Sequence, residues 1–148
     1  MSLEERITSA MREAMKARDA DRVSTLRMAM AAATNRRIEL GHTLTDEDTI
    51  GVLDRQVKQR RESAELFRGG GRPELAEKEE AEIAVLAEFL PAPLTDAEID
   101  ALIEAAIAAT GAAAPADMGK VMGMVAPQTK GRADGRAVSD KVKAALGG

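Results

Sequence analysis

Aromatic side chains are almost absent from this chain of 148 residues, since the only two are Phe67 and Phe89. Any hydrophobic core must therefore be built from aliphatic side chains and from the eight Met residues. Most of the aliphatic residues are Ala and Leu, and runs of β-branched residues are scarce, which favours helix almost throughout. We predict an all-α protein.

Capping residues, glycines and prolines predict where the helices begin and end. In the N-terminal part we expect helices over roughly 3–17 and 21–40, from Thr45 to the glycines near 69–71, and over 73–89. The segment LPAPL at 90–94 then interrupts the pattern, because two closely spaced prolines cannot continue a helix. We predict a domain boundary there, between a larger helical domain of about four helices over 1–90 and a small three-helix bundle over 91–148.

We expect three helices after this boundary. The first begins with a T-x-x-E capping box at Thr95 and reaches about residue 109. The second helix begins at about 115–117, and the third runs over about 134–146. Pro127 either ends the second helix or kinks it. Helical spacing predicts two inward-facing stripes, which are Met118, Val121, Met122 and Val125, and Val138, Val142, Ala145 and Leu146.

Residue types that form common catalytic and metal sites are scarce. Cys is absent, and the single His, His42, excludes a multi-histidine metal site and a histidine-based nucleophile pair. The glycine-rich segments lack the Gly-Lys-Ser/Thr ending of a phosphate-binding loop. The carboxylates of TDED at 45–48 could bind a hard cation, but a first helical turn favours capping. We predict no catalytic residue, no metal and no cofactor.

The chain begins with the charged segment SLEER and contains no run of about 18 apolar residues. The absence of Cys fits a reducing compartment. We expect a soluble, cytoplasmic protein that does not enter a membrane.

Charge is distributed unevenly along the chain. The net charge is −4, yet residues 117–148 carry six Lys and Arg against three Asp and Glu, whereas residues 91–116 carry four acidic residues and no basic one. A locally positive segment on an acidic molecule is typical of a directed binding surface.

The cations of this segment are interleaved with glycines. Gly119 and Gly123 lie four residues apart in one predicted helix, where each glycine costs about 0.5–1 kcal/mol relative to Ala. They would allow the close approach of another backbone, either a neighbouring helix or the sugar-phosphate chain of a ligand. We predict that the nearby cations form a phosphate-binding patch, although packing glycines and solvated lysines are the simpler interpretation; the cations are Lys120, Lys130, Arg132, Arg136 and Lys143. No aromatic residue lies here, so binding would use the RNA backbone and shape.

A second basic cluster lies in the segment RQVKQRRE, with Arg55, Lys58, Arg60 and Arg61. It could be a second nucleic-acid contact. The following helix, however, is rich in Glu, and ion pairing between neighbouring helices would neutralise the cluster. We favour internal pairing.

The segment ADMGKVMGMVAPQTKGRADGRAVSDKVKAAL resembles the YqeY family, and it is similar to the GatB tail domain of the glutamine-dependent amidotransferases that correct misacylated tRNA. The resemblance extends upstream through LRM at 26–28, LDRQVKQRRES at 53–63 and FLPAPLTDAEI at 89–99. It implies that the chain is a stand-alone relative of this tail domain, which binds tRNA outside the catalytic site of the amidotransferase. It also implies an extra helical domain on the N-terminal side.

Two functions follow from the residues and the resemblance. The first is an accessory module that binds tRNA or a similar structured RNA through the C-terminal cations. The second is a protein-interaction adaptor whose Met- and Ala-rich helical faces dock an enzyme of tRNA charging or amidation. Carbon–nitrogen ligase activity with glutamine as amido donor would rest on homology alone, because the serine-rich amidase segment is missing.

Overall fold

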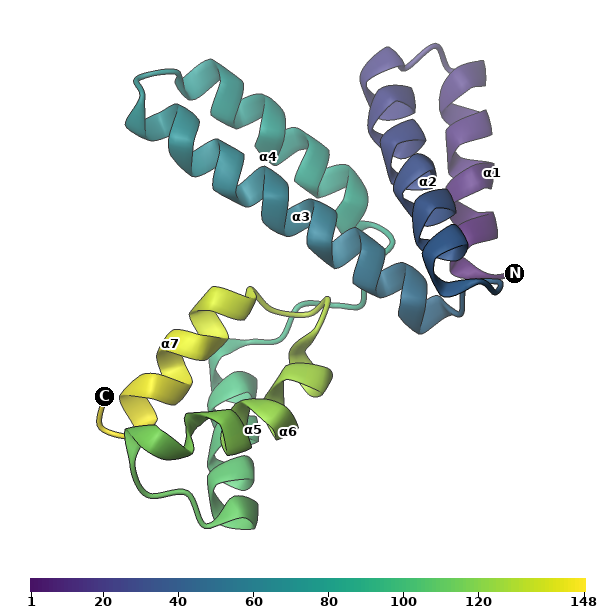
Figure 1. Ribbon diagram of the computed structural model, residues 1–148. Helices are drawn as coiled ribbons and strands as arrows, with labels where there is room; N and C mark the ends of the chain where they lie inside the picture. Colours follow the sequence, from purple (N-terminus) through teal and green to yellow (C-terminus); the bar gives the residue numbers. More distant parts are fainter. The chain divides into compact units, whose positions relative to one another are not determined.

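The computed structural model describes residues 1–148 and is built from α-helices without strands (Figure 1). The fold is therefore all-α, as the composition predicts. The helices are α1 (Leu3–Lys16), α2 (Ala20–Leu40), α3 (Asp46–Gly69), α4 (Pro73–Ala87), α5 (Asp96–Thr110), α6 (Met118–Thr129) and α7 (Gly135–Ala145), and a short 3₁₀ helix η1 (Pro115–Asp117) precedes α6. The chain divides into two compact units, Met1–Leu90 and Pro91–Gly148.

Local sequence signals set several helix ends. α1, α3 and α5 each begin with a capping box, in which Ser2, Thr45 and Thr95 are the N-cap residues. At Thr95, the hydroxyl accepts a hydrogen bond from the Glu98 N–H at 3.1 Å and the Glu98 carboxylate accepts one from the Thr95 N–H at 3.2 Å. The capping interpretation of TDED is correct, since Asp48 accepts the Thr45 N–H at 3.0 Å.

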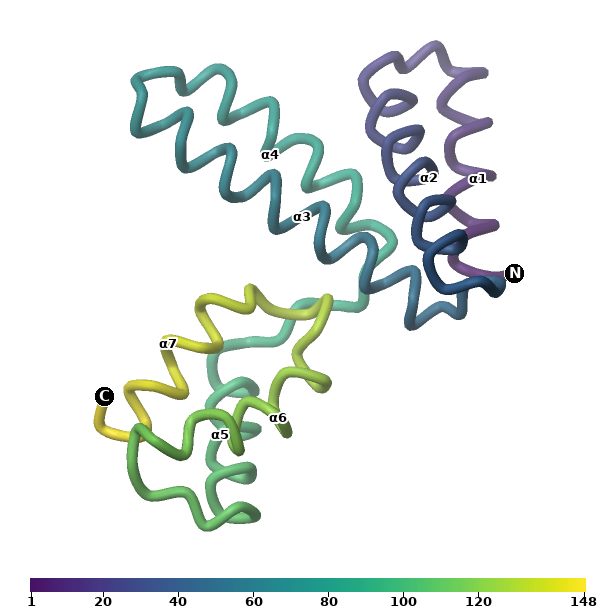
Figure 2. The backbone as a smooth tube through the Cα atoms, in the orientation of Figure 1, coloured from purple at the N-terminus to yellow at the C-terminus, as the bar shows by residue number.

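The N-terminal unit consists of two helical hairpins, α1–α2 and α3–α4, which Figure 2 traces. Its core is aliphatic, with Ile7, Leu26, Leu53 and Leu86 almost completely buried. Phe89 closes this core with only 8% of its surface exposed, and the Arg6 guanidinium lies 5.9 Å from the centre of its ring. One of the two aromatic side chains is thus used for packing.

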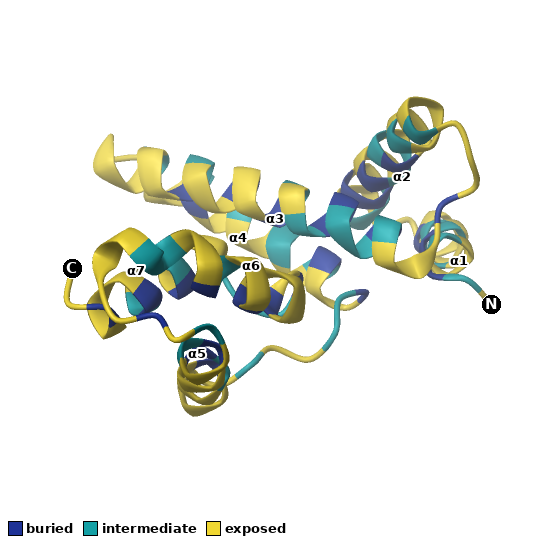
Figure 3. Cartoon of the chain, turned by 60° about the horizontal axis from the view of Figure 1, so that its bottom comes forward, coloured by how far each residue is buried: buried dark blue, intermediate teal, exposed yellow.

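The C-terminal unit packs α5, α6 and α7 around a small core of Val and Ile. Figure 3 shows both buried and exposed positions along α6 and α7. The fully buried ones include Val121, Val125, Val138 and Val142. Met118 and Met122 pack against this core as expected. The prediction for Ala145 is wrong, because this last residue of α7 is exposed and Leu146, directly after it, takes the buried place.

Pro127 does not end α6, which continues to Thr129. A proline lacks the N–H that would bond to the carbonyl four residues earlier, so the helix loses one internal hydrogen bond at Gly123. The helix continues because Val125 and Thr129, on either side of the proline, are anchored in the core.

No single helix of the structure is both long enough and apolar enough to span a membrane. Only α5 together with the segment 115–129 reaches that length and composition, as a pair bent by 96°.

Candidate nucleic-acid interface

Two of the exposed positions of α6, Gly119 and Gly123, have no side chain. A Cβ atom placed on Gly119 or on Gly123 would have no other atom of the protein within 4 Å, apart from the adjacent residues and the helix's own backbone. Of the two alternatives for these glycines, close packing by another helix of the C-terminal unit is therefore excluded. The reason is that Val121 and Val125 turn the opposite side of α6 to the core. The glycines leave the helix backbone accessible to an external ligand.

Lys120 and Lys130 lie toward the two ends of this glycine face. At 100° per residue, Lys130 falls within about 20° of both glycines, whereas Lys120 flanks them. The two lysines are ten residues apart in the sequence, which corresponds to about 15 Å along the helix. Lys130 is exposed and makes no ion pair, and Lys120 is 67% exposed.

One carboxylate partly compensates Lys120. Asp117 lies 3.8 Å from its ammonium group, but the same carboxylate also accepts hydrogen bonds from the backbone N–H groups of Ala113 and Ala114. These hydrogen bonds, first that of Ala113, lower the pKa of Asp117. The carboxylate therefore primarily closes the loop before α6, and the long, exposed contact with Lys120 is easily exchanged for another anion.

Arg132 has a structural role that the sequence did not suggest. Its Nε donates a hydrogen bond to the Ala92 carbonyl at 3.1 Å, and its own carbonyl accepts one from the Leu94 N–H at 2.8 Å. Arg132 thus fastens the proline-containing segment to the turn between α6 and α7. Arg132 follows Lys130 by two residues, and its guanidinium is held by this backbone partner.

The remaining predicted cations are on α7. Arg136 and Lys143 are both exposed and lie near opposite ends of the helix, about 10 Å apart along its axis. Lys141, which the sequence did not single out, pairs with Asp100 at 2.9 Å and with Asp96 at 3.8 Å, and the hydrogen bond to Asp100 raises its pKa. Lys130 and Arg132 thus lie at the turn between α6 and α7, Lys120 lies near the start of α6, and Arg136 and Lys143 lie toward the two ends of α7.

The second basic cluster is divided between the interior and the surface. Arg60 is only 6% exposed, and its Nε lies 3.1 Å from the Glu82 carboxylate on α4. It also donates to the Gln56 carbonyl at 3.3 Å. Arg55 and Lys58, by contrast, are exposed and make no ion pair. Internal pairing therefore accounts for Arg60 and not for these two.

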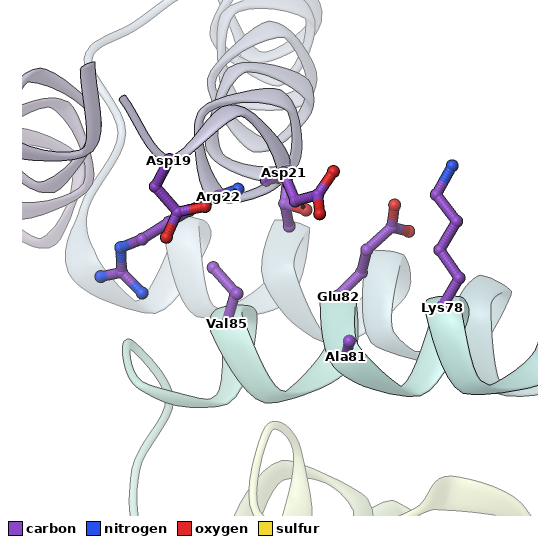
Figure 4. Close-up of a pocket in the computed structure, with 8 residues that line it drawn as sticks. Asp19, Asp21, Arg22, Lys78, Ala81, Glu82 and Val85 are labelled. Carbon is purple, nitrogen blue, oxygen red and sulfur yellow. Dashed lines mark hydrogen bonds between the residues drawn. The ribbon is translucent and has the colours of Figure 1, made fainter. Parts of the chain in front are cut away.

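A pocket of about 180 Å³ lies between the start of α2 and α4 in the N-terminal unit (Figure 4). Figure 4 shows Asp21 from α2 and Glu82 and Lys78 from α4 around it. Arg22 at its edge donates to both carboxylate oxygens of Glu88, at 2.5 and 3.1 Å, and this pair raises the pKa of Arg22. None of the predicted RNA-binding residues lines the pocket. No group of three or more His, Cys, Asp or Glu side chains could hold a metal ion.

Comparison with known proteins gives the family. The sequence model of the family described as Yqey-like protein matches residues 4–146, which is nearly the whole chain. The chain belongs to this family. The resemblance carried by the DMGKVMG and KGRADG segments is thereby confirmed at the level of the family.

A relative from the fission yeast Schizosaccharomyces pombe, described as uncharacterized protein C22F3.15, is 37% identical over 79 residues. The match covers 53% of this chain and 64% of the yeast protein, which is less than two thirds of that protein's length. Its description names no substrate or partner, so the function must be argued from the geometry.

Proposed function

We propose that the chain is an accessory module that binds tRNA or a similar structured RNA through the exposed face of α6. One observation carries the proposal. The helix has two open glycines on its solvent side, and an exposed lysine lies toward each end of the face that they form. A phosphodiester backbone can approach the helix closely at these glycines, because neither has a side chain, and it meets a positive charge toward either end of the face.

The type of contact follows from the residues available. The C-terminal unit has no aromatic side chain, so stacking on unpaired bases cannot contribute. Backbone contacts position an RNA but carry little sequence information. We therefore propose recognition of RNA shape and phosphates with weak, salt-sensitive affinity.

The cations contribute unequally to this proposal. Lys120 and Lys130 contact phosphates directly. Arg132 stabilises the turn that follows Lys130 and adds a positive charge to this turn. Arg136 and Lys143 extend the positive surface along α7. If about three phosphates are neutralised, the logarithm of the binding constant falls with the logarithm of the salt concentration with a slope of about −2 to −3.

The test is a titration of the chain with unmodified tRNA at several salt concentrations. The variant Lys120→Glu/Lys130→Glu should lose measurable binding while its helical circular dichroism is retained, because neither side chain packs in the core. Arg55→Glu/Lys58→Glu makes the same change in charge on exposed, unpaired residues of the N-terminal unit and should bind as the wild type does. Equal losses in both variants would refute the proposed site.

The second candidate function is that of an adaptor, in which the chain docks an enzyme of tRNA charging or amidation. It is supported by the 40% exposure of Met124, which lies next to Gly123 on the same helix. An interface with an apolar protein surface would be insensitive to salt, unlike phosphate binding. Neither proposal assigns the chain a catalytic step, and both place it in the cytoplasm.

A further inference from the structure

An open groove of about 450 Å³ lies in the N-terminal unit, where α1 ends and α2 begins. Its lining residues are Met15, Arg18, Ala20, Val23, Ser24 and Arg27. None of them belongs to the predicted RNA-binding residues. The groove combines an apolar floor with two guanidinium groups.

Arg18 and Arg27 make no ion pair, although other arginines of this unit do: Arg22 with Glu88, Arg37 with Glu4, Arg60 with Glu82 and Arg68 with Glu80. Of the acidic residues closest to them in the sequence, Asp21 does not line this groove and lines instead the pocket between α2 and α4. Glu13 pairs with Lys16 at 3.3 Å, and Asp19 accepts the Arg22 N–H at 3.2 Å. The groove therefore keeps an uncompensated positive charge on a protein of net charge −4.

Arg18 also occupies an unusual backbone position. Its φ is +57°, and it is the only residue other than glycine with a positive φ. α2 and α5 end on glycines in this conformation, Gly41 and Gly111. An L-residue costs about 1 kcal/mol or more there. Because a glycine at this position would make the folded chain more stable, the arginine indicates that its side chain has a function.

The apolar floor of the groove restricts the kind of ligand that can bind there. Met15 is 51% exposed, although it lies on the helix that contributes Leu3 and Ile7 to the core. Val23 beside it is half-buried, and a flexible methionine adapts to varied apolar partners. An RNA backbone offers only the C–H groups of its riboses to this floor, and the groove has no aromatic side chain to stack on a base. An amphipathic acidic peptide fits both the floor and the charges.

We propose that this groove docks an acidic amphipathic helical segment of a partner protein. Apolar side chains of the segment pack on Met15 and Val23, and its carboxylates pair with Arg18 and Arg27. This inference concerns a unit and a ligand different from those of the RNA proposal, so either can fail without the other.

The probe is a fluorescein-labelled helical peptide of about 16 residues, with Leu at positions i, i+4, i+7 and i+11 and Glu beside them. Fluorescence anisotropy with the full chain at low salt should show saturable binding. A peptide with Gln in place of each Glu, and another with Ser in place of each Leu, should each bind about tenfold more weakly. These two peptides separate the contribution of charge from that of the apolar floor.

Two variants test the groove itself. Arg18→Glu/Arg27→Glu should weaken binding of the acidic peptide at least about tenfold, and Arg55→Glu/Lys58→Glu, with the same change in charge, should not. Arg18→Gly removes the side chain and relieves the backbone, so it should raise the melting temperature and still weaken binding.

Four results would each overturn the inference. They are no saturable binding by the wild type, equal loss of binding in both charge-reversed variants, unchanged affinity in Arg18→Gly, and binding of the Gln peptide as tight as that of the Glu peptide. Binding of tRNA that depends on Arg18 and Arg27 would assign the groove to nucleic acid instead and would also overturn it.

Discussion

Replacing Gly119 and Gly123 with Ala tests why glycines lie on the open face of α6. An added methyl group meets no atom of the chain within 4 Å at either position, so it introduces no steric cost. Both glycines lie in α6 with ordinary negative φ, Gly119 in the first turn and Gly123 in the interior, where Ala is more stable than Gly by about 0.5–1 kcal/mol. The double variant should therefore increase the free energy of unfolding of the C-terminal unit by about 0.5–1.5 kcal/mol.

Urea unfolding followed by circular dichroism measures this change. Gly111→Ala is the matched control, because Gly111 also has open space around it but a φ of +69°. It should destabilise the same unit by about 1–2 kcal/mol. A destabilised Gly119→Ala/Gly123→Ala variant would refute the open face. A stabilised variant with undiminished affinity for tRNA would show that the glycines have no role in binding.

Three further predictions concern the rest of the molecule. Glu82→Ala should cost about 2–4 kcal/mol because it leaves a buried guanidinium unpaired, whereas Glu80→Ala, which breaks an exposed pair, should cost less than about 1 kcal/mol; urea unfolding compares them. The hydrogen bond from the Thr95 N–H lowers the pKa of Glu98 below its ordinary value of 4.5, so this cap adds stability above that pH and loses it as the pH falls through the lowered pKa. Glu98→Gln, which can still form the cap, should therefore reduce the loss of stability measured between about pH 5 and pH 2. Limited proteolysis should cut near 91–94, and Arg132→Ala should accelerate this cleavage because it removes the hydrogen bond to the Ala92 carbonyl; cleavage inside α3 would contradict the domain boundary.

Helix ends were predictable because their causes are local. Thr95 and Glu98 are three residues apart, and the capping box that they form needs no other part of the chain. The inward stripe of α6 followed from its period for the same reason. Pro127 was less predictable, since its effect depends on whether the packing on both sides of it holds the helix together.

Contacts between distant residues could not be read from the sequence. Arg132 and Ala92 are forty residues apart, and nothing in either segment indicates their hydrogen bond. Arg60 and Glu82 could be expected to lie on neighbouring helices, but the burial of Arg60 depends on how α2 covers α3. Periodicity likewise placed Gly119 and Gly123 beside the core stripe of α6, but it could not show that α5 and α7 leave them uncovered.

A nuclear magnetic resonance titration of the isotope-labelled chain with tRNA at low salt tests the central proposal most directly. The backbone amide signals of Gly119, Gly123 and Lys130 should shift or broaden at the lowest tRNA concentrations and recover as salt is added. The amide of Gly41, in the N-terminal unit, should remain unchanged and serves as the internal reference. Changes confined to the N-terminal unit, or none on α6 when tRNA is in excess, would contradict an RNA-binding face on this helix.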